Sequence, residues 1–285
     1  MRAGIRCAVA VIGIGATVVA GSAVLNLSSP QQVRLAAASQ SIAPFPIASV
    51  SPTSTQAVGI AHPVVVTFRA PVANRPAAEE ALKIASTPPM TGKYEWLDSK
   101  TVRWNPDRYW PAHSTIALTV EGQPTQIKTG PAVIGIASIA EHTFTVSIDG
   151  VETGPPQSLP APHHRPHFGE PGVLPASLGR PEYPTPVGSY TVLSKDRSVQ
   201  MDSSSVGIPV NDPDGYLVTV DYAVRITNHG LFVHSAPWAV NSLGLDNVSH
   251  GCISLSPEDA EWYYNTVNVG DPVVVREHTN ELPSS

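Results

Sequence analysis

Short apolar runs separated by turn residues dominate the chain between residues 62 and 130. Polar positions interrupt the apolar ones as in half-buried strands, and the chain's 29 prolines and 21 glycines indicate many turns and short strands rather than long helices. The expected strands are HPVVVTF (62–68), GKYEWLD (92–98), TVRWNP (101–106) and STIALTVEG (114–122). One short helix is expected at RPAAEEALKIA (75–85), where Pro76 suits the first turn. This pattern predicts a small antiparallel β-sandwich over residues 48–130.

A second β-rich block begins near Val133. The run IGIASIAEHTFTVSIDGVET (134–153) predicts strands that meet at a turn near Asp149-Gly150. Further strands are expected at SYTVLSK, VQMDSS, YLVTVDY and GLFVHS, and at the closing DPVVVRE. Between the last two, Ser256-Pro257-Glu258-Asp259 favours the start of a helix, because Ser is a good N-cap and acids suit the first turn. This helix is expected to end near Val267.

The predicted fold is therefore mainly β. An immunoglobulin-like sandwich (48–130) is followed by a β-rich second domain (131–278) with one or two short helices, and by a tail at 279–285. Aromatic residues of the first domain are interpreted as core packing in preference to a ligand-stacking surface; they are Trp96, Trp104, Tyr109 and Trp110.

The N-terminus has the pattern of an export signal. Arg2 and Arg6 precede a segment without charge that extends from Cys7 to Leu27. Residues 1–27 are thus expected to be a signal peptide or a membrane anchor, since the apolar run is just long enough to span a bilayer. Residues 28–47 are expected to be a flexible tether. The predicted location is the periplasm or cell wall, and a net charge of −6 argues against nucleic acid as a partner.

Cys252 is the only cysteine outside the N-terminal segment, so an intramolecular disulfide is not expected. It is either a small buried apolar residue or a nucleophile, and a nucleophilic thiol needs a nearby base or positive field. His234, at the end of GLFVHS, is the better candidate base, and the Ser235 carbonyl is expected to orient its ring. The amides of Gly251 and Cys252 are expected to stabilise an oxyanion. A thiol paired in this way is expected to alkylate well below pH 8.

Two motifs carry a resemblance to a known family. His234-Ser235-Ala236-Pro237-Trp238, followed by Ser249-His250-Gly251-Cys252, closely resembles the signature of L,D-transpeptidases with a YkuD-type catalytic domain. The resemblance covers residues 133–276 and includes PTPVGSY (184–190), and the first domain resembles the immunoglobulin-like module of some relatives.

The resemblance implies a cell-wall enzyme that uses no metal or organic cofactor. Its partners would be peptidoglycan stem peptides: a tetrapeptide donor would acylate the cysteine and release D-alanine, and a diaminopimelate amine would accept the acyl group to give a 3→3 cross-link. Carbapenem β-lactams would acylate the same thiol.

Carried over by motif, Cys252 is the nucleophile, His234 the base and Ser235 the residue that orients it. Ser249, His250 and Gly251 form the nucleophile loop. The substrate-binding candidates are Met201, Tyr216, Trp238 and Ser254, and core packing is an equally good interpretation of Met201. Ser254 departs from the Asn or Arg that relatives often have at this position.

Three other functions remain open at this point. One is an L,D-carboxypeptidase that passes the acyl group to water, and another is attachment of wall peptides to a protein lysine. The third is a non-catalytic protein that binds the cell wall. The Pro-rich and His-rich loop 153–172 is expected to act as a lid, and a solvated loop is preferred to a metal site at His163, His164 and His167.

Overall fold

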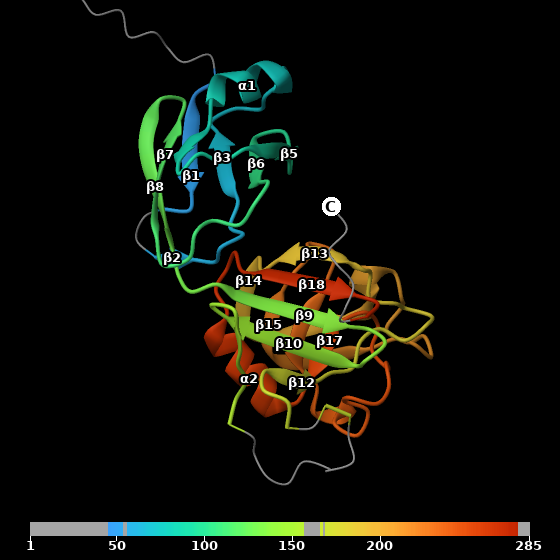
Figure 1. The fold of residues 1–285 in the computed structure, drawn as a ribbon. Coiled ribbons are helices and arrows are strands. Elements are labelled where there is room, and N and C mark those ends of the chain that lie inside the picture. Colours follow the sequence, from blue (N-terminus) through green and yellow to red (C-terminus); the bar gives the residue numbers. More distant parts are fainter. Residues whose placement is uncertain (1–44, 54–55, 157–165, 168, 279–285) are drawn as a thin grey trace, which may run out of the picture. The chain divides into compact units, whose positions relative to one another are not determined.

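The computed structural model describes residues 45–53, 56–156, 166–167 and 169–278 (Figure 1). The predicted signal or anchor at 1–27, most of the predicted tether and the tail from residue 279 lie outside these ranges. None of the helices within the described ranges is long and apolar enough to cross a membrane.

The first domain is a sandwich of two four-stranded sheets, as predicted, and all its strand pairs are antiparallel except that of β2 with β8, which is parallel. One sheet has the order β1 (Ile47–Ser51), β3 (Val64–Phe68), β6 (Thr101–Pro106) and β5 (Gly92–Trp96). The other has the order β2 (Ala57–Val58), β8 (Gln123–Thr129), β7 (Thr115–Val120) and β4 (Ala85–Thr87). In β7 exposed and buried positions alternate strictly, which places Ile116, Leu118 and Val120 in the core.

Helix α1 (Arg75–Leu82) begins where the sequence predicts it. The side chain of Asn74 caps it by accepting a hydrogen bond from the Ala77 amide, and a proline stands in its first turn. Trp104 and Trp110 are buried with ring centroids 6.0 Å apart, and the Trp110 indole donates to the His62 carbonyl at 2.8 Å. Trp104 and Trp110 therefore stabilise the core of the sandwich, and Trp96 packs against it. The interpretation as core packing is wrong for Tyr109, which is 46% exposed.

The second domain contains a six-stranded sheet. The order is β11 (Val151–Glu152), β10 (Thr143–Ile148), β9 (Val133–Ser138), β18 (Pro272–Arg276) and β13 (Gly188–Thr191), and β12 (Val173–Pro175) also pairs with β10. The predicted turn at Asp149-Gly150 closes the β10–β11 hairpin. Both turn residues have positive φ, 52° and 82°, as tight two-residue hairpin turns require.

The second sheet of this domain has two different faces. Its order is β14 (Ser194–Asp202), β15 (Leu217–Arg225), β16 (Phe232–Ser235) and β17 (Ile253–Leu255), and β16 and β17 are parallel. Val224, Val233 and Ile253 belong to the large core of the domain, which also contains Phe144 and Tyr263. The opposite face carries a smaller apolar cluster in which Cys252 packs with Val220, Ala223 and Phe232.

Helix α2 (Pro257–Thr266) follows β17 directly. Ser256 is its N-cap and accepts a hydrogen bond from the Asp259 amide at 3.1 Å, and Val267 is its C-cap, as predicted. Two short 3₁₀ turns, η1 (Ser203–Val206) and η2 (Pro237–Ala239), follow β14 and β16. Trp238 of η2 is one of the residues that line the cleft described below.

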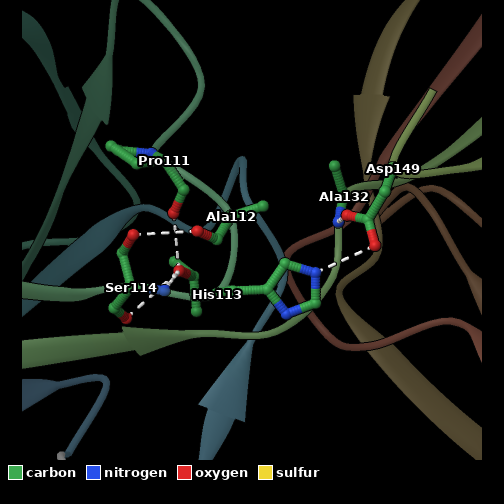
Figure 2. A network of polar contacts seen from close by, with 7 residues as sticks. Pro111, Ala112, His113, Ser114, Ala132 and Asp149 are labelled. Carbon is green, nitrogen blue, oxygen red and sulfur yellow. Dashed lines mark hydrogen bonds and ion pairs between the residues drawn. The ribbon is translucent and has the colours of Figure 1, made fainter.

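A polar network surrounds the connection between β8 and β9 (Figure 2). The Asp149 carboxylate accepts hydrogen bonds from the Ala132 amide and from His113 Nε2, each at 2.9 Å. The Thr129 hydroxyl donates to the Pro111 carbonyl at 2.6 Å and accepts from the Ser114 amide at 3.0 Å. These bonds fix the turn at 111–114 against the end of β8.

Candidate active site

A cleft of about 340 Å³ lies on the Cys252 face of the second sheet. Eight of the ten site residues predicted from the sequence line it, and the remaining two, Ser235 and Gly251, adjoin it in the chain. The lining side chains are Met201, Tyr216, Val218, Val220, His234, Trp238, Val248, Ser249, His250, Cys252 and Ser254. A larger open cleft of about 660 Å³, which includes His142 and Thr185, does not contain the thiol, so the smaller cleft is the candidate active site.

The parallel pairing of β16 with β17 brings the two reactive residues together. His234 pairs with Ser254, and Cys252 directly precedes β17. Because alternate residues of a strand face the same side, Cys252 and Ser254 share the face on which His234 lies. The sheet thus places a thiol and an imidazole in one cleft although they lie eighteen residues apart in the sequence.

The His234 ring is held in one tautomer. Its Nδ1 lies 2.8 Å from the Ser235 carbonyl oxygen, which can only accept, so Nδ1 carries the proton and Nε2 has a free lone pair. The residue is 4% exposed, and burial lowers its pKa, with the Ser235 hydrogen bond opposing this shift. His234 is therefore neutral at pH 7 and has the form that a general base requires.

The Cys252 thiol is a neutral group in this structure. Burial raises its pKa to about 11, while the Phe232 backbone amide and the Arg225 charge lower it. The thiol donates to the Gly230 carbonyl at 3.6 Å. The sequence-based expectation that the thiol alkylates well below pH 8 does not fit this environment, because desolvation outweighs the groups that stabilise the thiolate.

The nucleophile loop is fixed by two hydroxyl groups. The Ser249 hydroxyl accepts from the Gly251 amide at 3.0 Å and donates to the Cys252 carbonyl at 2.6 Å. The buried Thr185 hydroxyl donates to the Gly251 carbonyl at 2.7 Å and accepts from the Gly179 amide at 2.8 Å. Gly251 has φ +113°, a conformation that side chains rarely adopt.

These bonds correct one expectation about the loop. The Gly251 amide was expected to donate to an oxyanion, but it donates to the Ser249 hydroxyl in this conformation. They also identify Thr185 as a residue that the sequence analysis missed. It lies within the quoted motif PTPVGSY, but its bond to Gly251 spans 66 residues and no local pattern indicates it.

His250 packs between two tyrosine rings. Its ring centroid lies 4.8 Å from that of Tyr183 and 5.0 Å from that of Tyr216, and burial lowers its pKa, with the Arg180 charge acting in the same direction. Arg180 forms an ion pair with Asp214, which also accepts from the Tyr183 hydroxyl at 3.3 Å. His250 thus packs the nucleophile loop against both tyrosines, and within the described residues its buried Nε2 has no hydrogen-bond partner.

The predicted substrate-binding residues form the walls of the cleft. Tyr216 is half-buried, and burial raises its pKa, as does the nearby Cys252. Met201 is half-buried and packs against the apolar cluster around Phe232, so it both packs and lines the cleft. Trp238 is 58% exposed, with its ring 6.1 Å from that of His234. Ser254 is 3% exposed, so only a small part of it borders the cleft.

Within the described residues, no group of three or more His, Cys, Asp or Glu side chains is arranged to hold a metal ion. Of the loop histidines considered for such a site, His167 contacts Glu170, with Nδ1 3.1 Å from the carboxylate. His163 and His164 lie outside the described residues, as does half of the predicted lid at 153–172.

Comparisons with known proteins identify a family for each of the two domains. Residues 165–275 match the family described as the L,D-transpeptidase catalytic domain, and residues 36–124 match the bacterial Ig domain family. The chain is 68% identical over 280 residues to a Mycobacterium tuberculosis protein named probable L,D-transpeptidase 3, an alignment that covers 97% of this chain and 100% of the relative.

Two solved structures that contain β-lactams are also similar. L,D-transpeptidase 3 from Mycobacterium tuberculosis in complex with a faropenem-derived adduct aligns with a TM-score of 0.78 and 70% identity, over 82% of this chain and 99% of that chain. LD transpeptidase LdtMt1 in complex with imipenem aligns with a TM-score of 0.72 and 49% identity, over 81% and 99% of the two chains.

Proposed function

Because the chain belongs to the L,D-transpeptidase family, we propose that it forms 3→3 cross-links between diaminopimelate residues of peptidoglycan through a thioester on Cys252. The donor is a stem tetrapeptide, and D-alanine is the leaving group. The observation that carries the proposal is the pairing, in one cleft, of a lone thiol with an imidazole whose Nδ1 is tied to the Ser235 carbonyl.

Acylation begins with rotation of the thiol away from the Gly230 carbonyl toward His234 Nε2. The raised pKa of Cys252 and the lowered pKa of His234 both oppose an imidazolium–thiolate pair. Proton transfer to Nε2 therefore accompanies attack of sulfur on the scissile carbonyl. The S–C bond forms, the C–N bond breaks, and the imidazolium returns the proton to the leaving D-alanine amine.

The second half of the reaction reverses these roles. The acceptor amine attacks the thioester carbonyl, His234 removes a proton from the amine, and the thiol leaves in its protonated form. The amide of Cys252, adjacent to the reacting sulfur, is the proposed oxyanion donor, since the Gly251 amide is bonded to Ser249. The thioester conserves the energy of the broken amide for the new one, so no nucleotide is needed.

β-Lactams are proposed as covalent inhibitors. Two relatives have been solved with imipenem and with a faropenem-derived adduct, and in this chain the Cys252 thiol lies in one cleft with His234. Ring opening by Cys252 would give a thioester whose hydrolysis requires water to enter the cleft. The apolar wall that Trp238, Val218 and Val220 provide disfavours this step.

Action on peptidoglycan requires that the catalytic domain lie outside the cytoplasmic membrane. The proposed route is export by residues 1–27, which remain attached as an anchor or are removed as a signal peptide. The support is the order of Arg2, Arg6 and the apolar segment in the sequence.

The test is mass spectrometry of the purified protein incubated with a disaccharide-tetrapeptide. Cys252→Ala and His234→Ala serve as inactive variants, and His229→Ala serves as a control because His229 is an exposed histidine outside the cleft. Removal of the base is expected to slow acylation by about 10²- to 10⁴-fold.

The products decide among the candidate functions. A cross-linked dimer with free D-alanine, absent from the Cys252→Ala sample, supports transpeptidation. A tripeptide without dimer indicates the L,D-carboxypeptidase. If no product and no acyl-enzyme form, the proposal is wrong and the non-catalytic cell-wall-binding protein becomes the favoured alternative.

A further inference from the structure

Arg225 lies in one row with the nucleophile on the active-site face of the sheet. The register pairs Arg225 of β15 with Phe232 of β16, and the pairing of Val233 with Ile253 places Phe232 beside Cys252. Val233 and Ile253 face the large core. Because neighbouring residues of a strand point to opposite faces, the other three side chains share the active-site face. The row therefore runs Arg225, Phe232, Cys252.

Phe232 holds the guanidinium near the thiol. Arg225 Cζ lies 4.3 Å from the centre of the Phe232 ring, a favourable cation–π distance. Phe232 and Cys252 pack in the same apolar cluster. The charge thus lies on the far side of a single aromatic side chain from the sulfur, in a region where apolar packing reduces screening.

The charge of Arg225 is not compensated by an ion pair. Within the part of the chain that the structure describes, no carboxylate lies within 4.0 Å of this half-buried guanidinium. Arg197, on the neighbouring strand β14, also covers an aromatic ring, but it pairs with Glu261. Arg225 therefore contributes a net positive potential on this face of the sheet.

Arg225 does not line the cleft, so its effect on the reaction is exerted through space and not by contact with substrate. We propose that Arg225 is a positioning residue whose uncompensated charge, held over Phe232, stabilises the Cys252 thiolate as it forms. The inference rests on the proposed function, in which Cys252 is the nucleophile.

The other titratable groups around the thiol can be separated from Arg225 by pH. They are His234 of β16, His250 of the nucleophile loop and Tyr216, which precedes β15. The pKa values of both histidines are lowered by burial, and that of Tyr216 is raised by burial. All three are neutral between pH 8 and about 9.5. A difference in thiol reactivity between wild type and a variant at residue 225 in this pH range therefore reports the charge of that residue.

The experiment measures the rate of Cys252 alkylation by iodoacetamide in the full chain between pH 8 and about 9.5. Arg225→Met keeps an apolar stem over Phe232 but removes the charge, and we expect the rate to fall about three- to tenfold, since tenfold corresponds to one pKa unit. Arg225→Lys keeps the charge and is expected to stay within about twofold of the wild-type rate. Arg197→Met is the matched control and is expected to alkylate at the wild-type rate.

An unchanged rate in Arg225→Met would overturn the inference, and so would an equal fall in Arg197→Met. Thermal unfolding of each variant identifies misfolding, and Arg225→Gln replaces Arg225→Met if the latter does not fold. Alkylation needs no peptide substrate. A rate that depends on Arg225, found together with no tetrapeptide product, would therefore refute the proposed function and leave this electrostatic assignment in place.

Discussion

Replacing Thr185 by valine tests whether one buried hydroxyl holds the nucleophile loop. Valine has nearly the same shape, so the change removes the two hydrogen bonds of the hydroxyl and little packing. The Gly251 carbonyl loses a donor at 2.7 Å and the Gly179 amide loses an acceptor at 2.8 Å. Thr185 is 3% exposed, so water does not readily replace the hydroxyl.

The magnitude follows from the two backbone groups left without a partner. Each unsatisfied buried group costs about 1–3 kcal/mol, and partial relaxation of the loop reduces the sum to about 2–4 kcal/mol of unfolding free energy. Acylation by imipenem should slow as well, because Gly251 directly precedes the nucleophile and its carbonyl fixes the orientation of the peptide unit that leads to Cys252.

The assay combines urea unfolding with the rate of imipenem adduct formation followed by mass spectrometry. Thr219→Val is the matched control, because Thr219 is exposed on β15 and its replacement should change stability by less than about 0.5 kcal/mol. The reasoning fails if Thr185→Val unfolds within about 0.5 kcal/mol of wild type and acylates at the same rate.

Two further predictions concern the thiol and the loop at residues 207–216. Because the pKa of Cys252 is raised to about 11, its alkylation by iodoacetamide should increase by about tenfold per pH unit from pH 8 to 10, and a plateau below pH 8 would contradict the burial of the thiol. Asp214→Asn removes the ion pair with Arg180, which is partly exposed, so the melting temperature should change little while limited proteolysis within 207–216 accelerates. Equal proteolysis of wild type and variant would show that the ion pair does not hold this loop.

The sequence predicts those features that depend on neighbouring residues. The alternation in STIALTVEG predicts β7, the Asp149-Gly150 pair predicts a hairpin, and Ser256-Pro257 predicts the start of α2. The motifs around His234 and Cys252 likewise identify the two residues that meet in the cleft. In each case the relevant contacts are local or lie within a signature of fixed spacing.

Features that depend on register or burial could not be predicted in this way. The row from Arg225 to Cys252 requires the pairing of three strands, and β15 contains an irregularity at Tyr222, whose φ is +53°. The sequence also does not show the surroundings of the partly exposed thiol, whose desolvation raises its pKa to about 11 and so opposes alkylation well below pH 8. The bond from Thr185 to Gly251 depends on the same long-range packing.

The hydrogen bond from the Cys252 thiol to the Gly230 carbonyl favours the protonated thiol and so affects how readily the sulfur is oxidised. Oxidants such as peroxides react with the thiolate and scarcely with the protonated thiol. At pH 7 a thiol with a pKa of about 11 is ionised in only about one molecule in ten thousand. The cleft therefore keeps its sulfur at pH 7 in a form that resists sulfenic acid formation, and proton transfer to the imidazole makes the sulfur nucleophilic when a carbonyl is bound.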